Sequence, residues 1–299
     1  MASTNIEVAN ARSVQSFIGL VSHATAPGVQ RFYRGVPKHF NKSVPSVFRS
    51  PTRIENEKLL FNQLLARNPS DFAADATTLD KLVRMQHHGL PTRLLDITSN
   101  PLMALYFACE KEPTKDGEVF VLSVPDYDVK FPDSDRASVV ANLARLTTAQ
   151  RKAVSALAAD SFSLPIDERI KVFNKDRSVL RLLHFIKQEK PYFEAKINSR
   201  NIPSILVVRA KLSNPRIAAQ GGAFILFGDG ATFEGSSKGR SILDTVITIP
   251  AKSKAGMLRD LDHLGINEAT VYPGLERSAA YIAKPFPVRG QGKDQRAIK

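Results

Sequence analysis

The sequence has little of what membrane-spanning and secreted proteins need. Its single cysteine, Cys109, excludes an internal disulfide and is typical of proteins in a reducing compartment. No apolar run approaches the ~20 residues that a membrane span requires. The first residues lack a basic stretch followed by an apolar one, so no secretory signal is expected. We therefore expect a soluble, cytoplasmic protein without a membrane partner.

The chain also lacks the short motifs of several enzyme classes. It has no Walker A loop, no GxSxG elbow and no HExxH element, and its six histidines never stand at H-x₃-H spacing. Residues 228–235 (GDGATFEG) have the wrong glycine spacing for a dinucleotide fingerprint and predict a polar turn. Without a second thiol or a histidine pair, a structural metal site is not expected.

Negative charge is scarce at both ends of the chain. The formal net charge is +13. Residues 1–50 hold six basic residues and one acidic residue, and residues 284–299 hold five basic residues and one acidic residue. One interpretation is a pair of solvated termini that aid solubility. The other is a positive surface that attracts nucleic acid, a nucleotide or an acidic partner.

Apolar spacing predicts helices in the first two thirds of the chain and strands later. The expected helices are 54–66, 71–85, 101–110, 137–159, 177–188 and 253–264. The expected strands are 117–124, 204–212, 223–227 and 244–249, and residues 128–136 and 160–176 read as loops. This order favours an α+β fold over a regular βαβ repeat.

Three segments combine hydrogen-bonding side chains with strongly apolar neighbours. They are RFYRGV at 31–36, a long block at 86–108, and NPRIAAQGGAFILFG at 214–228. Such a mixture suggests polar side chains that a core anchors and directs into a cleft. We expect residues 31–36, 96–99 and 216–224 to converge there.

Arg34 is the candidate ligand-binding residue of the first segment, between Tyr33 and Gly35. A glycine allows close approach of a ligand to the backbone, and a guanidinium can clamp a phosphate through two hydrogen bonds. The alternative is a structural ion pair of Arg34.

The second segment holds a dense polar run of Gln86, His87, His88, Arg93 and Asp96, which reads as one loop. Arg93 and Asp96 are expected to form a buried ion pair that shapes this loop, with Arg93 also a candidate ligand-binding residue. One of the two histidines is expected either to face a ligand or to make structural hydrogen bonds, and His88 is the catalytic candidate.

Thr98 and Ser99 precede a helix that starts at Pro101. Ser99 or Asn100 can cap that helix, since serine and asparagine are favoured at this position. Thr98 and Ser99 are equally well placed to bind an anion, because backbone N–H groups at a helix start attract negative charge. Both interpretations stay open.

The chain resembles the FRG domain family, which is named for a Phe-x-Arg-Gly element that residues 32–35 (FYRG) match. The block QHHGLPTRLLDITSNPLMALYFA at 86–108 resembles the family's central motif. The further resembling stretches are 133–146, 182–197, 214–228 and 247–282. The resemblance implies an extension at 1–29, an FRG domain at 30–283 with a helical insertion at roughly 126–200, and a basic tail at 284–299.

A weaker resemblance is to ADP-ribosyltransferases of the arginine-serine-glutamate type. Tyr33, Arg34 and Gly35 resemble the first element, whose arginine holds the NAD diphosphate. Thr98 and Ser99, followed by ALYFA, resemble the second element, and residues 216–224 fall where the third would lie. The resemblance implies an ADP-ribosyltransferase-like split β-sheet with surrounding helices. It also implies NAD as the ligand and substrate.

The third element departs from that pattern. Gln220 is followed by Gly-Gly-Ala, with no glutamate two residues later, where a carboxylate would stabilise developing positive charge. The departure implies a degenerate NAD site, a different substrate, or a carboxylate from elsewhere, for which Glu189, Glu194 and Glu276 are candidates. Alternatively, Gln220 and its glycines only form a tight turn into a strand.

Together these observations predict an FRG-domain protein that binds NAD or a related nucleotide. The candidate catalytic residues are Gln220, His88 and Ser99; the candidate nucleotide-binding residues are Arg34, Gly35, Tyr33, Thr98, Ser99 and Arg93. The reaction would be ADP-ribosyl transfer or NAD cleavage, by an effector in bacterial or phage conflict, with a protein or nucleic-acid target. The alternative is a non-catalytic module that binds nucleotide, nucleic acid or protein.

Overall fold

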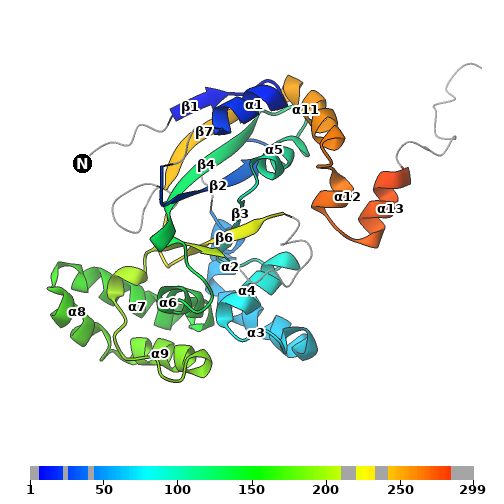
Figure 1. Ribbon diagram of the computed structural model, residues 1–299. Helices are drawn as coiled ribbons and strands as arrows, with labels where there is room; N and C mark the ends of the chain where they lie inside the picture. Colours follow the sequence, from blue (N-terminus) through cyan, green and yellow to red (C-terminus); the bar gives the residue numbers. More distant parts are fainter. Residues whose placement is uncertain (1–6, 23–25, 40–43, 210–219, 233–241, 284–299) are drawn as a thin grey trace, which may run out of the picture.

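The computed structural model describes residues 7–22, 26–39, 44–209, 220–232 and 242–283 (Figure 1). The expected basic tail at 284–299 and residues 216–219 of the third polar segment lie outside the described residues. None of the described helices is long and apolar enough to cross a membrane.

Seven strands form one sheet in the order β1-β7-β4-β2-β3-β6-β5. They are β1 (Glu7–Asn10), β2 (Val29–Val36), β3 (Leu94–Thr98), β4 (Gly117–Pro125), β5 (Ile205–Arg209), β6 (Gly222–Phe227) and β7 (Leu243–Ile249). All neighbours are antiparallel except β1 and β7, which are parallel. A largely antiparallel sheet together with many helices confirms the predicted α+β class.

Two neighbouring strands in the middle of the sheet, β2 and β3, share the fewest paired residues. β2 pairs with β4 from Val29 to Val36, and β3 pairs with β6 from Leu94 to Thr98. By contrast, β2 and β3 pair only at Tyr33 and Thr98. The two halves of the sheet therefore diverge on either side of this pair and leave room between them.

Helices account for most of the remaining structure (Figure 1). They are α1 (Val14–Val21), α2 (Pro51–Glu55), α3 (Glu57–Arg67), α4 (Thr78–His87), α5 (Pro101–Cys109), α6 (Asp135–Asn142), α7 (Thr148–Asp160), α8 (Ile166–Phe173), α9 (Arg177–Glu189), α11 (Ala251–His263), α12 (Glu268–Val271) and α13 (Leu275–Ala283). Between β4 and β5 every named element is helical.

Two of the three apolar cores each pack on one half of the sheet, and the third, which includes Phe32 and Ile225, joins both halves. The β2–β4–β7 half packs against α1, α5 and α11, with Phe17, Leu105 and Met257 among the buried residues. The β3–β6–β5 half packs against the helices between β4 and β5, through residues such as Leu226 and Leu182. A cavity lies between these two halves, lined by residues of β2 and α5 on one side and of β3, β6 and α4 on the other.

Several expected boundaries needed correction. The predicted helix 71–85 starts only at Thr78, because Thr77 and Asp80 form a reciprocal cap there. The predicted helix 137–159 is two helices, α6 and α7, since Thr147 caps a new start with Gln150. Residues 166–173, expected as loop, form α8.

Candidate functional site

A cavity of about 370 Å³ lies where β2 and β3 diverge. Its walls come from β2, the last turn of α4, β3, the C-terminal end of α5 and the start of β6. Arg34, Asp96 and Gln220 line the same cavity. All three polar segments thus contribute described residues to one cavity, as expected, although Ser99 is not among its lining residues.

Arg34 enters this cavity as a cation that pairs with no carboxylate of the described residues. Its Nη1 donates to the backbone oxygen of Asp96 at 2.6 Å, and its buried Nε has no hydrogen-bond partner. Burial lowers the pKa of Arg34 to about 10; the charge of Asp96 opposes this shift and that of Arg49 adds to it. Desolvated but still charged, the guanidinium has donor capacity that the described protein does not use.

Gly35 serves helix packing. A Cβ atom at this position would lie 1.8 Å from the backbone oxygen of Ala104 in α5. Only glycine therefore lets α5 pack this closely on β2. The helix in turn brings Phe107 and Glu110 to the cavity wall.

Thr98 and Ser99 hold the turn that precedes β6. Thr98 Oγ1 donates to the backbone oxygen of Gln220 at 2.5 Å, and Ser99 Oγ donates to that of Gly221 at 3.3 Å. Gly221 has a φ of +57°, which suits glycine. Of the alternatives for the helix cap, Asn100 is the residue that caps α5, through a bond from Leu102 N.

Gln220 lines the cavity, and its side-chain amide is bonded to a neighbouring helix. Its Nε2 donates to the backbone oxygen of Val271 in α12 at 2.8 Å. This bond ties the start of β6 to the C-terminal helices. The amide is thereby fixed in orientation at the cavity wall.

The expected ion pair between Arg93 and Asp96 is wrong. Asp96 is exposed, and its Oδ2 accepts a hydrogen bond from Gln86 Nε2 at 2.9 Å. Arg93 is fully buried. The segment was expected to be a loop, but residues 94–98 form β3, and in a strand side chains three positions apart point to opposite sides.

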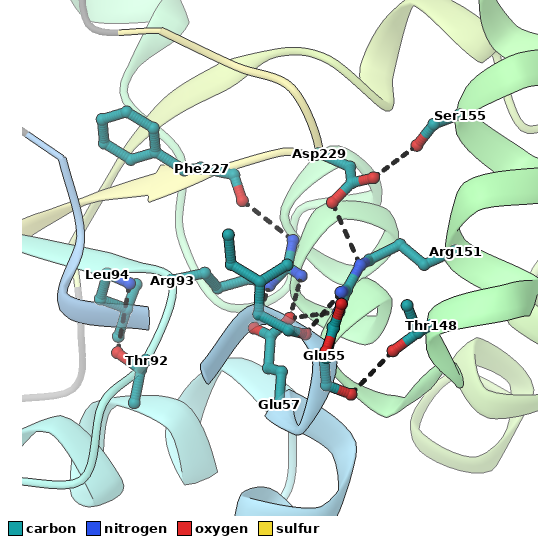
Figure 2. A network of polar contacts seen from close by, with 11 residues as sticks. Glu55, Glu57, Thr92, Arg93, Leu94, Thr148, Arg151, Ser155, Phe227 and Asp229 are labelled. Atoms are coloured by element: carbon teal, nitrogen blue, oxygen red, sulfur yellow. Dashed lines mark hydrogen bonds and ion pairs between the residues drawn. The ribbon is translucent and has the colours of Figure 1, made fainter. Parts of the chain in front are cut away.

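Arg93 belongs to a buried ionic network (Figure 2). Its guanidinium contacts both oxygens of Glu57, at 2.8 and 2.6 Å, and the backbone oxygen of Phe227 at 3.0 Å. Arg151 of α7 contacts the same carboxylate at 2.8 Å and Asp229 at 3.2 Å. Two carboxylates thus balance two guanidinium groups. Arg93 is a structural residue here and not part of the cavity lining, which corrects its expected role in nucleotide binding.

Of the two neighbouring histidines, the structure places His87 at the cavity. His87 is among the lining residues, whereas His88 ends α4 as an exposed residue outside the lining. Their rings meet edge to face, with centroids 5.1 Å apart. The choice of His88 as the catalytic candidate therefore does not fit the geometry.

The carboxylate of Glu110, which the sequence pattern did not single out, also lines the cavity. Its side chain is 15% exposed and accepts a hydrogen bond from Tyr272 at 2.7 Å. The signal for it was its position at the end of α5, the helix that follows β3. Because α5 packs on β2, its last turn must end near Arg34's strand.

Two of the three carboxylates proposed from sequence do not line the cavity. Glu189 accepts bonds from Thr78 N and Asn142 Nδ2 in the helical region. Glu194 is exposed and pairs with Lys196. The side chain of Glu276 lies outside the described residues.

A second cavity of about 940 Å³ adjoins the first and shares His87, Glu110 and Lys111 with it. Its other walls come from α5, which contributes Tyr106, and from α11, α12 and α13 and the residues that follow them, among them Tyr272. Among the described residues no group of three or more His, Cys, Asp or Glu side chains could hold a metal ion.

Comparison with known proteins bears on part of this site. No curated protein and no solved structure matches the chain. The FRG domain family model matches residues 30–117. This segment includes β2, α4, β3 and α5, and so supplies Arg34, His87, Asp96 and Glu110. The part of the chain that builds most of the cavity wall is therefore identified as an FRG domain.

Proposed function

We propose that the cavity binds the diphosphate of a nucleotide, with NAD as the candidate ligand and Arg34 as the residue that holds it. The observation that carries this proposal is the guanidinium of Arg34, which is desolvated, lines a cavity and pairs with no carboxylate in the part of the chain that the structure describes. A charged group in that position is stabilised by an anion. A diphosphate fits the planar fork of an arginine through paired hydrogen bonds.

The two adjoining cavities suit a dinucleotide, whose two nucleosides are joined by a diphosphate. The first, of about 370 Å³, is small among ligand pockets, which span roughly 300–1,000 Å³. The second shares three lining residues with it and is lined by tyrosines. A dinucleotide whose diphosphate lies at Arg34 can extend from one into the other.

The cavity also holds carboxylates that could replace the missing glutamate. Glu110 stands at the boundary of both cavities, and Asp96 lines the first. When the bond between ribose C1′ and nicotinamide breaks, its electrons leave with nicotinamide and positive charge develops on the ribose, which a carboxylate stabilises. Water or a target side chain then bonds to C1′ and gives up its proton to a base, for which His87 is the candidate.

On this proposal the protein is an ADP-ribosyltransferase-like enzyme that transfers ADP-ribose or cleaves NAD. The single-pair contact between β2 and β3 supports a split sheet of that type. Transfer to a protein or nucleic-acid target, or loss of cellular NAD, would suit a toxin or a phage-defence effector.

Calorimetry with NAD and ADP-ribose tests the binding step. We expect Arg34→Lys to weaken binding about tenfold or more, since a lysine copies paired hydrogen bonds poorly. Arg53→Lys is the matched control, because Arg53 is exposed, lies outside the lining and likewise donates to a backbone oxygen, that of Ser46. Absence of binding at millimolar ligand, or equal losses in both variants, would refute the proposal.

Turnover tests the chemistry separately. With Glu110→Gln we expect NAD binding to stay within a few-fold of the wild type while nicotinamide release falls about a hundredfold or more. Tyr272→Phe, which removes the hydroxyl that donates to Glu110, should have a smaller effect. Binding without any nicotinamide release by the wild type would leave a nucleotide-binding protein and remove the enzyme proposal.

A further inference from the structure

A groove lined by basic side chains lies on the helical region, away from the sheet. This cavity of about 520 Å³ is bounded by Lys58 of α3, Gln150 of α7 and a row of residues on α9. The α9 residues are Arg177, Leu180, Arg181 and His184. No acidic side chain is among the lining residues, so nothing in the wall neutralises its cations.

The guanidinium of Arg181 is held in place by stacking. It lies 4.5 Å from the ring centroid of Phe185, and the guanidinium of Arg145 lies 4.3 Å from the same centroid. Within the described part of the chain Arg181 makes no hydrogen bond or ion pair. Stacking on an aromatic ring orients a guanidinium while leaving its N–H groups available to an anion.

Arg145 and His184 are linked to each other through the side chain of Gln188. Arg145 donates to Gln188 Oε1 at 2.5 Å, and Gln188 Nε2 contacts His184 Nε2 at 3.2 Å. Burial lowers the pKa of Arg145; the carboxylate of Glu189 opposes this shift, and the charge of Arg181 adds to it. Like charges are thus held close together, an arrangement that a bound anion would relieve.

The spacing of the cations allows contact with a chain of phosphates. Arg177, Arg181 and His184 follow one another at four and three residues, so they share one face of α9. At a rise of about 1.5 Å per residue the row spans about 10 Å. A nucleic-acid strand carries a negative charge at every nucleotide, so a row of this length can contact more than one phosphate of the strand.

We propose that this basic groove, formed by Lys58, Arg177, Arg181 and His184, binds the phosphate backbone of a nucleic-acid strand. The wall is hollowed, which suits a strand better than a flat membrane surface, and Leu180 is its sole apolar lining residue. The groove shares no lining residue with the Arg34 cavity. In Figure 1 α9 and α12 lie at well-separated parts of the molecule.

A charge-reversal experiment tests the groove. Fluorescence anisotropy of labelled single-stranded DNA and RNA is measured over a series of KCl concentrations with the double variant Arg177→Glu/Arg181→Glu. We expect its affinity to fall about tenfold or more, and the slope of log K against log salt to shrink by about 0.7 for each cation removed. Arg177 is the first residue of α9, where a glutamate suits the helix dipole, so the fold should persist.

The matched control is Lys115→Glu/Lys252→Glu, which changes the net charge equally at exposed residues outside the groove. We expect this control to keep affinity within about threefold of the wild type. Equal losses in both double variants, no oligonucleotide binding by the wild type at low salt, or loss of binding only to anionic lipid vesicles would each overturn the proposal. NAD binding by Arg177→Glu/Arg181→Glu should be unchanged, so this result is independent of the Arg34 proposal.

Discussion

Arg93 and Asp96, only three positions apart, point to opposite sides of β3. The ladder with β6 continues through Arg93, whose backbone oxygen accepts from Phe227 N at 3.0 Å. Arg93 is buried against Glu57, whereas Asp96 is exposed and lines the cavity. One strand therefore divides its polar residues between a structural network and the candidate site.

The first prediction concerns the network. Glu57→Gln should destabilise the protein by about 3–5 kcal/mol, because it leaves two buried guanidinium groups with too little negative charge. Glu55→Gln, the same change at an exposed residue two positions earlier, should cost less than about 0.5 kcal/mol. Urea unfolding of both variants measures the difference. Similar losses would mean that the buried pairs contribute no more than a surface charge.

The second prediction concerns the other side of the strand. Asp96→Asn should change the free energy of unfolding by less than about 1 kcal/mol, since the side chain is exposed and keeps an oxygen for Gln86 Nε2. It should change nucleotide affinity, because it removes a negative charge near Arg34. Tighter binding of ADP-ribose in calorimetry is the expected sign. A large loss of stability with unchanged affinity would make Asp96 structural.

The residues that line the cavity could largely be predicted from sequence, whereas the partners of buried charged residues could not. The three polar segments were recognisable because each mixes ligand-type side chains with apolar anchors, and pairing of Thr98 with Gly222 brings two of them together. The partner of Arg93 could not be predicted. Glu57 lies 36 residues earlier, at the start of helix α3. Only tertiary packing brings its side chain to that of Arg93.

The short elements were missed for a related physical reason. β3 contains a charged and a hydroxyl residue within five positions, so its composition resembles a loop. α8 has only eight residues, too few for its spacing to stand out, and it is stabilised by contacts with other helices instead. His87 and His88 are adjacent, and only the exact end of α4 decides which one reaches the cavity.

The third prediction concerns Gly35. Gly35→Ala should destabilise the protein by several kcal/mol, because its Cβ would lie 1.8 Å from a backbone oxygen of α5, which no side-chain movement can relieve. Gly19→Ala, in α1 where a Cβ meets nothing within 4 Å, should instead stabilise by about 0.5–1 kcal/mol. Thermal melting of the two variants should therefore shift in opposite directions. If Gly35→Ala melts like the wild type, α5 does not constrain this position.

The last prediction concerns the single cysteine and alkaline pH. Burial raises the pKa of the Cys109 thiol to about 12, although the charge of Lys254 opposes the shift, whereas a thiol in an unfolded chain has a pKa of about 8.5. Above that lower value the unfolded chain releases the thiol proton while the folded chain keeps it, so stability falls as pH rises. Between pH 7 and pH 10 the wild type should lose about 2 kcal/mol more than Cys109→Ala, which lacks the thiol. Urea unfolding of both proteins at the two pH values measures this. An identical pH dependence would mean that the thiol ionises as readily in the folded chain as in the unfolded one, and that α5 is less tightly packed around it than its burial indicates.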